Sequence, residues 1–130
     1  MKEKELIVQA FNNYTLSYDD SIPMDEGIKE FIYSLNKSSS IKTTNSCAGH
    51  DKFESNAKYD FVSHPYLAFL VNEKGWDVFW SEVLPRLCGE VLVHIHIITE
   101  YQKTSICIRC HYEDKKAFWE NVKPLFHKYF

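Results

Sequence analysis

The stretch VLVHIHIITEYQKTSICIRCHY, residues 91 to 112, decides the fold class of this chain. Two segments rich in Val and Ile, Val91 to Thr99 and Thr104 to Tyr112, flank the short polar segment Glu100 to Lys103. β-branched residues in alternation with polar ones are typical of strands, and so short a break between two strands favours a β-hairpin. The sequence therefore predicts an antiparallel pair of strands here.

A two-residue loop of Tyr101 and Gln102 would fix the register of this hairpin. The predicted partners across the two strands are Glu100 and Lys103, His96 and Cys107, His94 and Arg109, and Leu92 and His111.

Alternation along both strands divides the hairpin side chains into two faces. The predicted core face holds Val91, Val93, Ile95, Ile97, Ile106, Ile108, Cys110 and Tyr112. The predicted polar face holds His94, His96, Cys107, Arg109 and His111. Antiparallel sheets commonly bury one face and leave the other to solvent, so we expect helices on the first face.

Helical spacing predicts four helices around this hairpin. The clearest runs from Met24 to about Lys37, where Ile28, Phe31, Ile32 and Leu35 recur at i, i+3, i+4 and i+7. A weaker pattern occupies residues 1 to 19. Asn72 can cap a helix whose apolar face is Trp76, Phe79, Trp80, Val83, Leu84 and Leu87, closed by Cys88-Gly89. Glu113-Asp114 opens the last helix, which Pro124 could kink.

Two more strands complete the predicted sheet. Ile41 to Thr44 is short and β-branched, and Pro65 to Val71 is almost continuously apolar, as in a central strand covered on both faces. Residues 51 to 63 have no clean period and are interpreted as a loop. The whole chain, residues 1 to 130, is thus predicted to be a single α+β domain. Its sheet is mainly antiparallel, has about four strands and carries helices packed on one face.

Composition and charge narrow the classes of function. The 130 residues are 45% hydrophobic, which is enough for one core, and 15 basic and 18 acidic residues are mixed along the chain. The net charge of −3 gives no basic surface for bulk nucleic-acid binding or for a membrane. The charged start, Met1 to Glu5, does not resemble a secretory signal, so we expect a cytoplasmic protein.

The turn Ser46-Cys47-Ala48-Gly49-His50 is the segment most indicative of a chemical site. Gly49 allows a sharp turn whose successive backbone N–H groups could bind an anion, and His50 could add a positive charge. The alternative is structural: Cys47 would be a small buried residue, Gly49 would supply a positive φ angle, and His50 would simply be exposed.

Two chemical roles remain open for the same turn. Cys47 could act as a catalytic nucleophile with His50 as its base, in a hydrolase or transferase. A zinc ion could instead be held by Cys47 and His50 together with His94 and His96. Because the spacing of these residues does not repeat the close ligand pairs of known zinc motifs, no metal or other cofactor is assigned.

The polar hairpin face is the second candidate. Its histidines and Arg109 would suit a phosphate or carboxylate group lying across the sheet, although a solvated sheet face would have the same pattern. His64, just before Pro65, is a weaker candidate for the same site.

The segment TTNSCAGH, residues 43 to 50, with the strand Tyr66 to Phe69, resembles small uncharacterised bacterial and phage proteins. Those proteins carry a threonine, a Ser-Cys-x-Gly-His motif and an aromatic strand. More distantly, Ser46 to Gly49 is similar to the Ser-Cys-Ser-Gly-Arg segment of the wybutosine-synthesis family, whose members act in tRNA modification. In this chain Ala48 and His50 replace the second Ser and the Arg. The resemblance implies a site in this segment without supplying its chemistry.

These observations predict a small-ligand binding protein for an anionic or nucleotide-like molecule. The expected ligand-binding residues are Ser46, Gly49, His50, His94, His96 and Arg109. The alternatives are an enzyme that uses Cys47 and His50 or a metal held by histidines, and a protein-interaction domain whose polar sheet face is incidental.

Overall fold

The computed structural model describes residues 2–16, 26–49, 64–87, 93–100 and 103–130. Its helices are α1 (Lys2–Asn13), α2 (Glu26–Leu35), α3 (Glu73–Val78), the π-helical η1 (Phe79–Val83), α4 (Leu84–Leu87), the 3-10 turn η2 (Tyr112–Asp114) and α5 (Lys115–Tyr129). Its strands are β1 (Ile41–Cys47), β2 (Tyr66–Val71), β3 (His94–Glu100) and β4 (Lys103–Arg109). His50, the loop predicted for residues 51 to 63, the helix end at Cys88-Gly89 and the hairpin loop lie outside the described residues.

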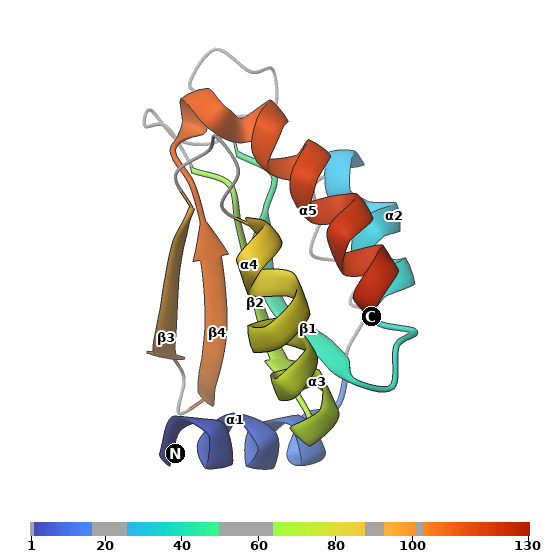
Figure 1. Cartoon of the computed structure of the whole chain (residues 1–130), viewed down its shortest axis with the longest axis vertical. Coiled ribbons are helices and arrows are strands. Elements are labelled where there is room, and N and C mark those ends of the chain that lie inside the picture. Colours follow the sequence, from blue (N-terminus) through green and yellow to red (C-terminus); the bar gives the residue numbers. More distant parts are fainter. Residues whose placement is uncertain (1, 17–25, 50–63, 88–92, 101–102) are drawn as a thin grey trace.

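The four strands form one antiparallel sheet in the order β1-β2-β4-β3 (Figure 1). β2 pairs with β1 on one side and with β4 on the other, so it is a central strand, as its apolar run predicts. Residues 67–71 are all buried. The chain is therefore an α+β fold of the predicted class.

The register of the β3-β4 hairpin agrees with the prediction. His94 lies opposite Arg109, His96 lies opposite Cys107, and Glu100 lies opposite Lys103. The strands are shorter than predicted, since β3 begins at His94 and β4 ends at Arg109, and the predicted partner of His111 lies outside the described residues.

One face of the sheet is covered by α2, α5 and the α3-η1-α4 run, which together are called the helix layer below (Figure 1). Phe69 of β2 lies at its centre, with ring centroids 5.3 Å from Phe79 of η1 and 5.5 Å from Phe126 of α5. All three rings are fully buried. Burial of a phenylalanine contributes about 1.5–3 kcal/mol, so these side chains bind the helix layer to the sheet.

The α3-η1-α4 run follows the predicted apolar face but contains a π-helical segment that the sequence pattern does not reveal. Asn72 is the N-cap, and its side chain accepts a hydrogen bond of 2.8 Å from the Gly75 N–H. Phe79, Val83 and Leu87 are buried, whereas Trp80 and Leu84 are half-buried.

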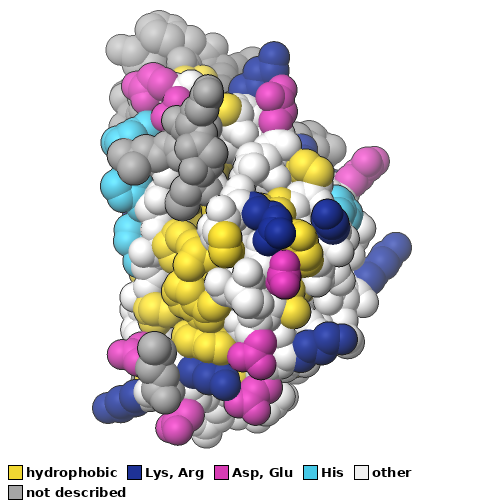
Figure 2. Space-filling view, viewed as in Figure 1, with side chains coloured by type: hydrophobic (Ala, Val, Ile, Leu, Met, Phe, Trp, Pro, Cys, Tyr) yellow, Lys and Arg dark blue, Asp and Glu magenta, His cyan; other side chains and the backbone are white. Residues whose placement is uncertain are grey.

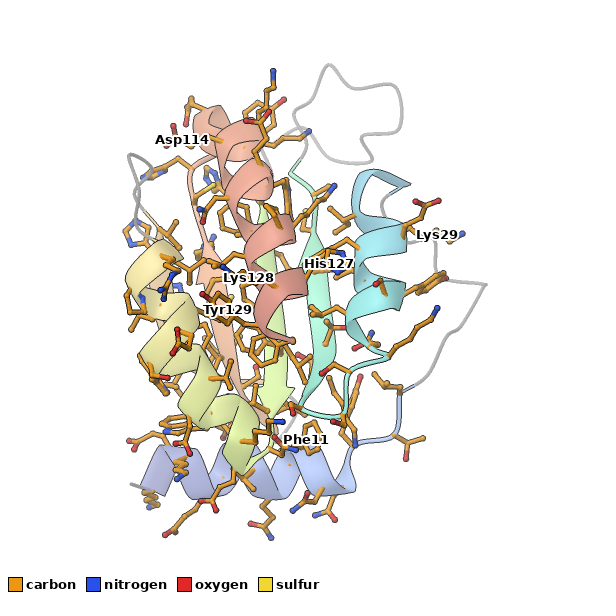
Figure 3. All side chains as sticks on the ribbon, turned by 45° about the vertical axis from the view of Figure 1, so that its right-hand side comes forward. Phe11, Lys29, Asp114, His127, Lys128 and Tyr129 are labelled. Carbon is orange, nitrogen blue, oxygen red and sulfur yellow. The ribbon has the colours of Figure 1, made fainter. Side chains whose placement is uncertain are left out.

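Helix α1 lies across one end of the sheet and contacts β2 and β4 (Figure 1). Lys42 of β1 ties it in place: its Nζ donates to the backbone oxygens of Phe11, at 2.7 Å, and Tyr14, at 2.9 Å. The same ammonium lies 4.4 Å from the centroid of the Phe11 ring, which points from α1 toward the sheet (Figure 3). The weak helical pattern near the N-terminus is thus a helix over Lys2–Asn13.

Strand β1 is longer than predicted. It continues past Thr44 to Cys47, and a shift of register between Thr43 and Asn45 accommodates the extra residue. The buried hydroxyl of Thr43 accepts a hydrogen bond from the Asn36 side chain at 2.7 Å, which satisfies the polar group inside the core. Ser46 and Cys47 therefore belong to a strand, and the predicted turn begins after them.

The predicted core face of β3 is only partly covered. Val93 and Ile95 are half-buried and Ile97 is 36% exposed, whereas Ile106 and Ile108 of β4 are fully buried. Val93 and Ile95 still pack against the core, so among the described residues of β3 the core prediction is wrong for Ile97, because this strand lies at the edge of the sheet, beside the helix layer. Figure 2 shows the resulting group of exposed apolar side chains on this side of the molecule.

The C-terminal helix begins one 3-10 turn later than predicted. Tyr112–Asp114 form η2, and α5 then runs from Lys115 through the exposed Pro124 to Tyr129. Within the described part of the chain, every helix is too short or too polar to cross a membrane.

Candidate functional site: a histidine face on the sheet

Side chains opposite the helix layer gather four histidines and an arginine at the end of the sheet away from α1. This cluster, called the histidine face, consists of His64, His94, His96, Arg109 and His111. All except the half-buried His64 are exposed. In Figure 2 histidine side chains follow the margin on which Figure 1 places β3.

The strand register places one row of side chains across this face. Cys47 of β1 lies opposite Tyr66 of β2, Tyr66 lies opposite Arg109 of β4, and Arg109 lies opposite His94 of β3. Neighbouring strands are about 4.8 Å apart, so Cys47 lies about 10 Å from Arg109 and about 14 Å from His94 along the row. The Cys47 thiol is thus on the same face as the hairpin groups without forming a Cys-His pair with them.

The histidine rings lie one beside the next along this face. The rings of His64 and His111 have centroids 5.7 Å apart at 84°. Those of His111 and His94 are 5.8 Å apart at 89°. His94 and His96 are stacked, with centroids 6.4 Å apart and planes 10° apart. The cluster is therefore a chain of imidazoles from the start of β2 to the outer edge of β3.

His64 has a defined tautomer. Its Nδ1 accepts a hydrogen bond of 3.0 Å from the Tyr112 backbone N–H, so the neutral ring carries its proton on Nε2. In this state the ring offers a hydrogen-bond donor to a ligand and no lone pair to a metal. A metal bound through Nε2 would require loss of that proton.

Arg109 is the group of this face whose chemistry is best suited to an anion. Its side chain is exposed, and it makes no hydrogen bond or ion pair anywhere in the described parts of the chain. A guanidinium presents its N–H donors in a planar fork that matches carboxylate and phosphate oxygens.

The Ser46 to His50 segment is divided by the fold. Cys47 is on the histidine face, whereas Ser46 lies opposite the core residue Leu67 and therefore on the other face. Gly49 has the predicted positive φ, at 93°. His50 lies outside the described residues, so its pairing with Cys47 stays a prediction.

The Ala48-Gly49 turn is held by α5. The Trp119 indole N–H donates to the Ala48 oxygen at 3.0 Å, and Lys115 Nζ donates to the Gly49 oxygen at 2.7 Å. Both turn residues are buried. These contacts give the turn a structural role: it anchors the end of β1, and with it the Cys47 end of the row.

The described thiol with a shifted pKa is not on the histidine face. Cys110 is 2% exposed, and burial, with the nearby charges of Asp114 and Glu113, raises the pKa of its thiol to about 11. It is therefore protonated at neutral pH, which makes it a poor nucleophile.

Metal binding has no support from the described side chains, among which no three of His, Cys, Asp and Glu are grouped to hold an ion. The zinc hypothesis included His50, which lies outside the described residues, so that composite site stays untested.

A separate groove of about 530 Å³ runs along the start of α5. Its charged lining is mixed, with Lys115, Lys116 and Lys123 beside Glu113 and Glu120. Lys115 is already bonded to Gly49. Because of this balance of charge, the groove is less suited to an anion than the histidine face is.

Tyr66 is the member of the row that sequence reasoning did not single out. Its signal is alternation along β2, which puts it two residues after His64 and opposite Arg109. His64 was predicted in a loop without a known face, and the contact with His111 now places it in the cluster.

Comparison with protein-family models, with curated proteins and with solved structures finds no match to this chain. The resemblance of the Ser46 to His50 segment to known proteins stays a prediction, and the candidate site rests on its own geometry.

Proposed function

We propose that this chain is a small-ligand binding protein whose histidine face recognises an anionic group, such as the phosphate of a nucleotide-like molecule. The observation that carries the proposal is the exposed guanidinium of Arg109, which has no ion-pair partner among the described residues and is flanked by imidazoles. An unpaired arginine among histidines is a favourable site for an anion.

Each group has a role in this proposal. Arg109 binds two oxygens of the anion through its fork, and His94, directly opposite, donates a further hydrogen bond. Hydrogen bonds to charged groups contribute about 1.5–3 kcal/mol each, so loss of Arg109 removes the largest single contribution.

The Cys47 end of the row supports the ligand site without binding the ligand. The bonds from α5 to Ala48 and Gly49 fix the end of β1, and β1 in turn pairs with β2, with Cys47 opposite Tyr66. In the proposal, Ser46 and Gly49 support the site without touching the ligand, which revises the role expected from sequence.

Isothermal titration at low ionic strength tests the proposal, with inorganic phosphate, nucleoside monophosphates and citrate as probes. We expect at least one probe to bind, and Arg109→Ala to weaken it by about tenfold or more, equivalent to about 1.4 kcal/mol. Arg109→Lys should fall between the two, because it keeps the charge and loses the fork.

Arg86→Ala is the matched control, since Arg86 is an exposed arginine of α4 bonded to Glu82 of the same helical run. The affinity of the Arg86→Ala variant for each probe should equal that of the native protein. Equal affinities of Arg109→Ala and the native protein for every probe, or no binding of any probe, would contradict the proposal.

A further inference from the structure

We propose that the gap between the rings of His94 and His96 receives the planar ring of a nucleoside phosphate whose phosphate group is bound by Arg109. This inference rests on the proposed function and adds the chemical class of the ligand. It depends on one juxtaposition: two parallel exposed imidazoles directly beside the anion-binding arginine.

The spacing of the two rings matches a sandwich around one aromatic ring. Their planes are 10° apart and their centroids are 6.4 Å apart. Stacked bases are separated by about 3.4 Å, so a ring inserted between two others needs about 6.8 Å. The distance between the two ring centroids is within a few tenths of an ångström of that spacing.

The backbone sets this spacing. His94 and His96 are two residues apart on β3, and alternate residues of a strand lie about 6.6–6.8 Å apart on one face. Ile95, between them, points to the other face, toward the helix layer. A planar ring can therefore enter without displacing an intervening side chain of β3.

The neighbours of the two histidines favour entry at this position. On β4, His96 lies opposite the short side chain of Cys107 and His94 lies opposite Arg109, so the guanidinium is next to the gap between the two rings. The other side is the edge of the sheet as the structure describes it. A ring bound there would lie one strand away from Arg109, about 4.8 Å across the sheet.

The orientation of His94 is supported from the side away from His96. His111 contacts it edge-to-face at 5.8 Å, His64 contacts His111 at 5.7 Å, and the Tyr112 N–H holds His64. A side chain ordered before binding loses less conformational entropy on binding, which strengthens affinity. The His94 ring is therefore the more ordered side of the gap, and the His96 ring is the side that can move to admit a ligand.

Titration calorimetry with adenosine 5′-monophosphate, ribose 5-phosphate and inorganic phosphate separates ring stacking from phosphate binding. Stacking of a base on an aromatic side chain contributes about 1–3 kcal/mol, so the nucleotide should bind about tenfold or more tightly than the sugar phosphate. His96→Ala should remove that difference, so that the nucleotide and ribose 5-phosphate bind with similar affinity. His96→Phe should retain it, because a phenyl ring also stacks.

His127→Ala serves as the control, because His127 is an exposed histidine of α5 beside α2, remote from the hairpin (Figure 3). Equal binding of nucleotide and sugar phosphate, with both still weakened by Arg109→Ala, would overturn the stacking proposal and leave the anion site standing. Binding of all three probes that is indifferent to Arg109→Ala, or no binding at all, would overturn the anion site and the stacking proposal with it.

Discussion

Gly49 is the residue whose backbone fixes the end of β1. Its φ of 93° lies in the left-handed region, and an added Cβ would come within 3.1 Å of Pro65 Cδ and 3.2 Å of Lys115 Cδ. The sequence allowed this conformation to be predicted, because a glycine before a polar loop is typical of such turns. The hydrogen bonds from Lys115 to the Gly49 oxygen and from Trp119 to the Ala48 oxygen depend on α5 and could not be predicted from the local sequence.

Gly49→Ala should therefore lower the free energy of unfolding by about 1–2 kcal/mol, the cost of a left-handed conformation for an L-residue. Chemical denaturation measures the change. Lys116→Ala, at an exposed position of α5, should stay within about 0.5 kcal/mol of the native protein. A Gly49→Ala variant as stable as the native chain would contradict the described turn.

The buried thiol of Cys110 gives a test of pH dependence. Because burial raises its pKa to about 11, the folded state holds this proton more tightly than the unfolded state does. The contribution to stability is complete at neutral pH and is lost as the pH rises toward 11. Between about pH 9 and 11, the native protein should lose stability more steeply than Cys110→Ala in parallel denaturation series. Identical dependence of stability on pH in the native protein and in Cys110→Ala would contradict the raised pKa of this thiol.

At the scale of elements, the hairpin was the most predictable part of the fold. A two-residue loop leaves one register, and that register sets the faces of His94, His96 and Arg109. Strand β1 was less predictable. Its sequence becomes polar after Thr44, which suggests that the strand ends there, but the shift of register after Thr43 allows it to continue to Cys47. The exposure of Ile97 depends on where the helix layer ends over the sheet, and this cannot be predicted from the sequence around Ile97.

The N-cap of α3 is an element with a clear energetic test. Asn72 accepts from Gly75 N–H at 2.8 Å and its Nδ2 donates to the Ser39 oxygen at 3.1 Å. Asn72→Ala loses both bonds and should lower stability by about 1 kcal/mol or more. Asn72→Asp keeps the acceptor and should lose less. Thermal denaturation of the two variants measures this order, and the reverse order would contradict the capping role.

At the scale of the whole molecule, the site arises because β2 and β4 are neighbours. Their pairing brings His64, before β2, against His111, after β4, and aligns Tyr66 with Arg109. These residues are far apart in the sequence, so composition and periodicity could indicate the polar hairpin face but not the full cluster. The pairing of β1 with β2 adds Cys47 to the same row.

The number of imidazoles in the histidine face predicts a pH-dependent affinity. A protonated imidazole attracts an anion more strongly than a neutral one does. Sulfate is a suitable probe because its charge is constant in this range, and we expect tighter binding at pH 6 than at pH 8. His94→Ala/His96→Ala should flatten the profile, whereas His127→Ala should not. A native affinity independent of pH would contradict participation of the histidines.

The most direct test of the histidine face as a ligand site is a histidine side-chain NMR titration with inorganic phosphate. We expect the imidazole resonances of His94, His96 and His111 to shift together as phosphate is added, while those of His127 stay unchanged. In Arg109→Ala the same shifts should need about tenfold more phosphate. Unchanged resonances throughout the cluster at saturating phosphate, or equal shifts of His127, would contradict a ligand site on the histidine face.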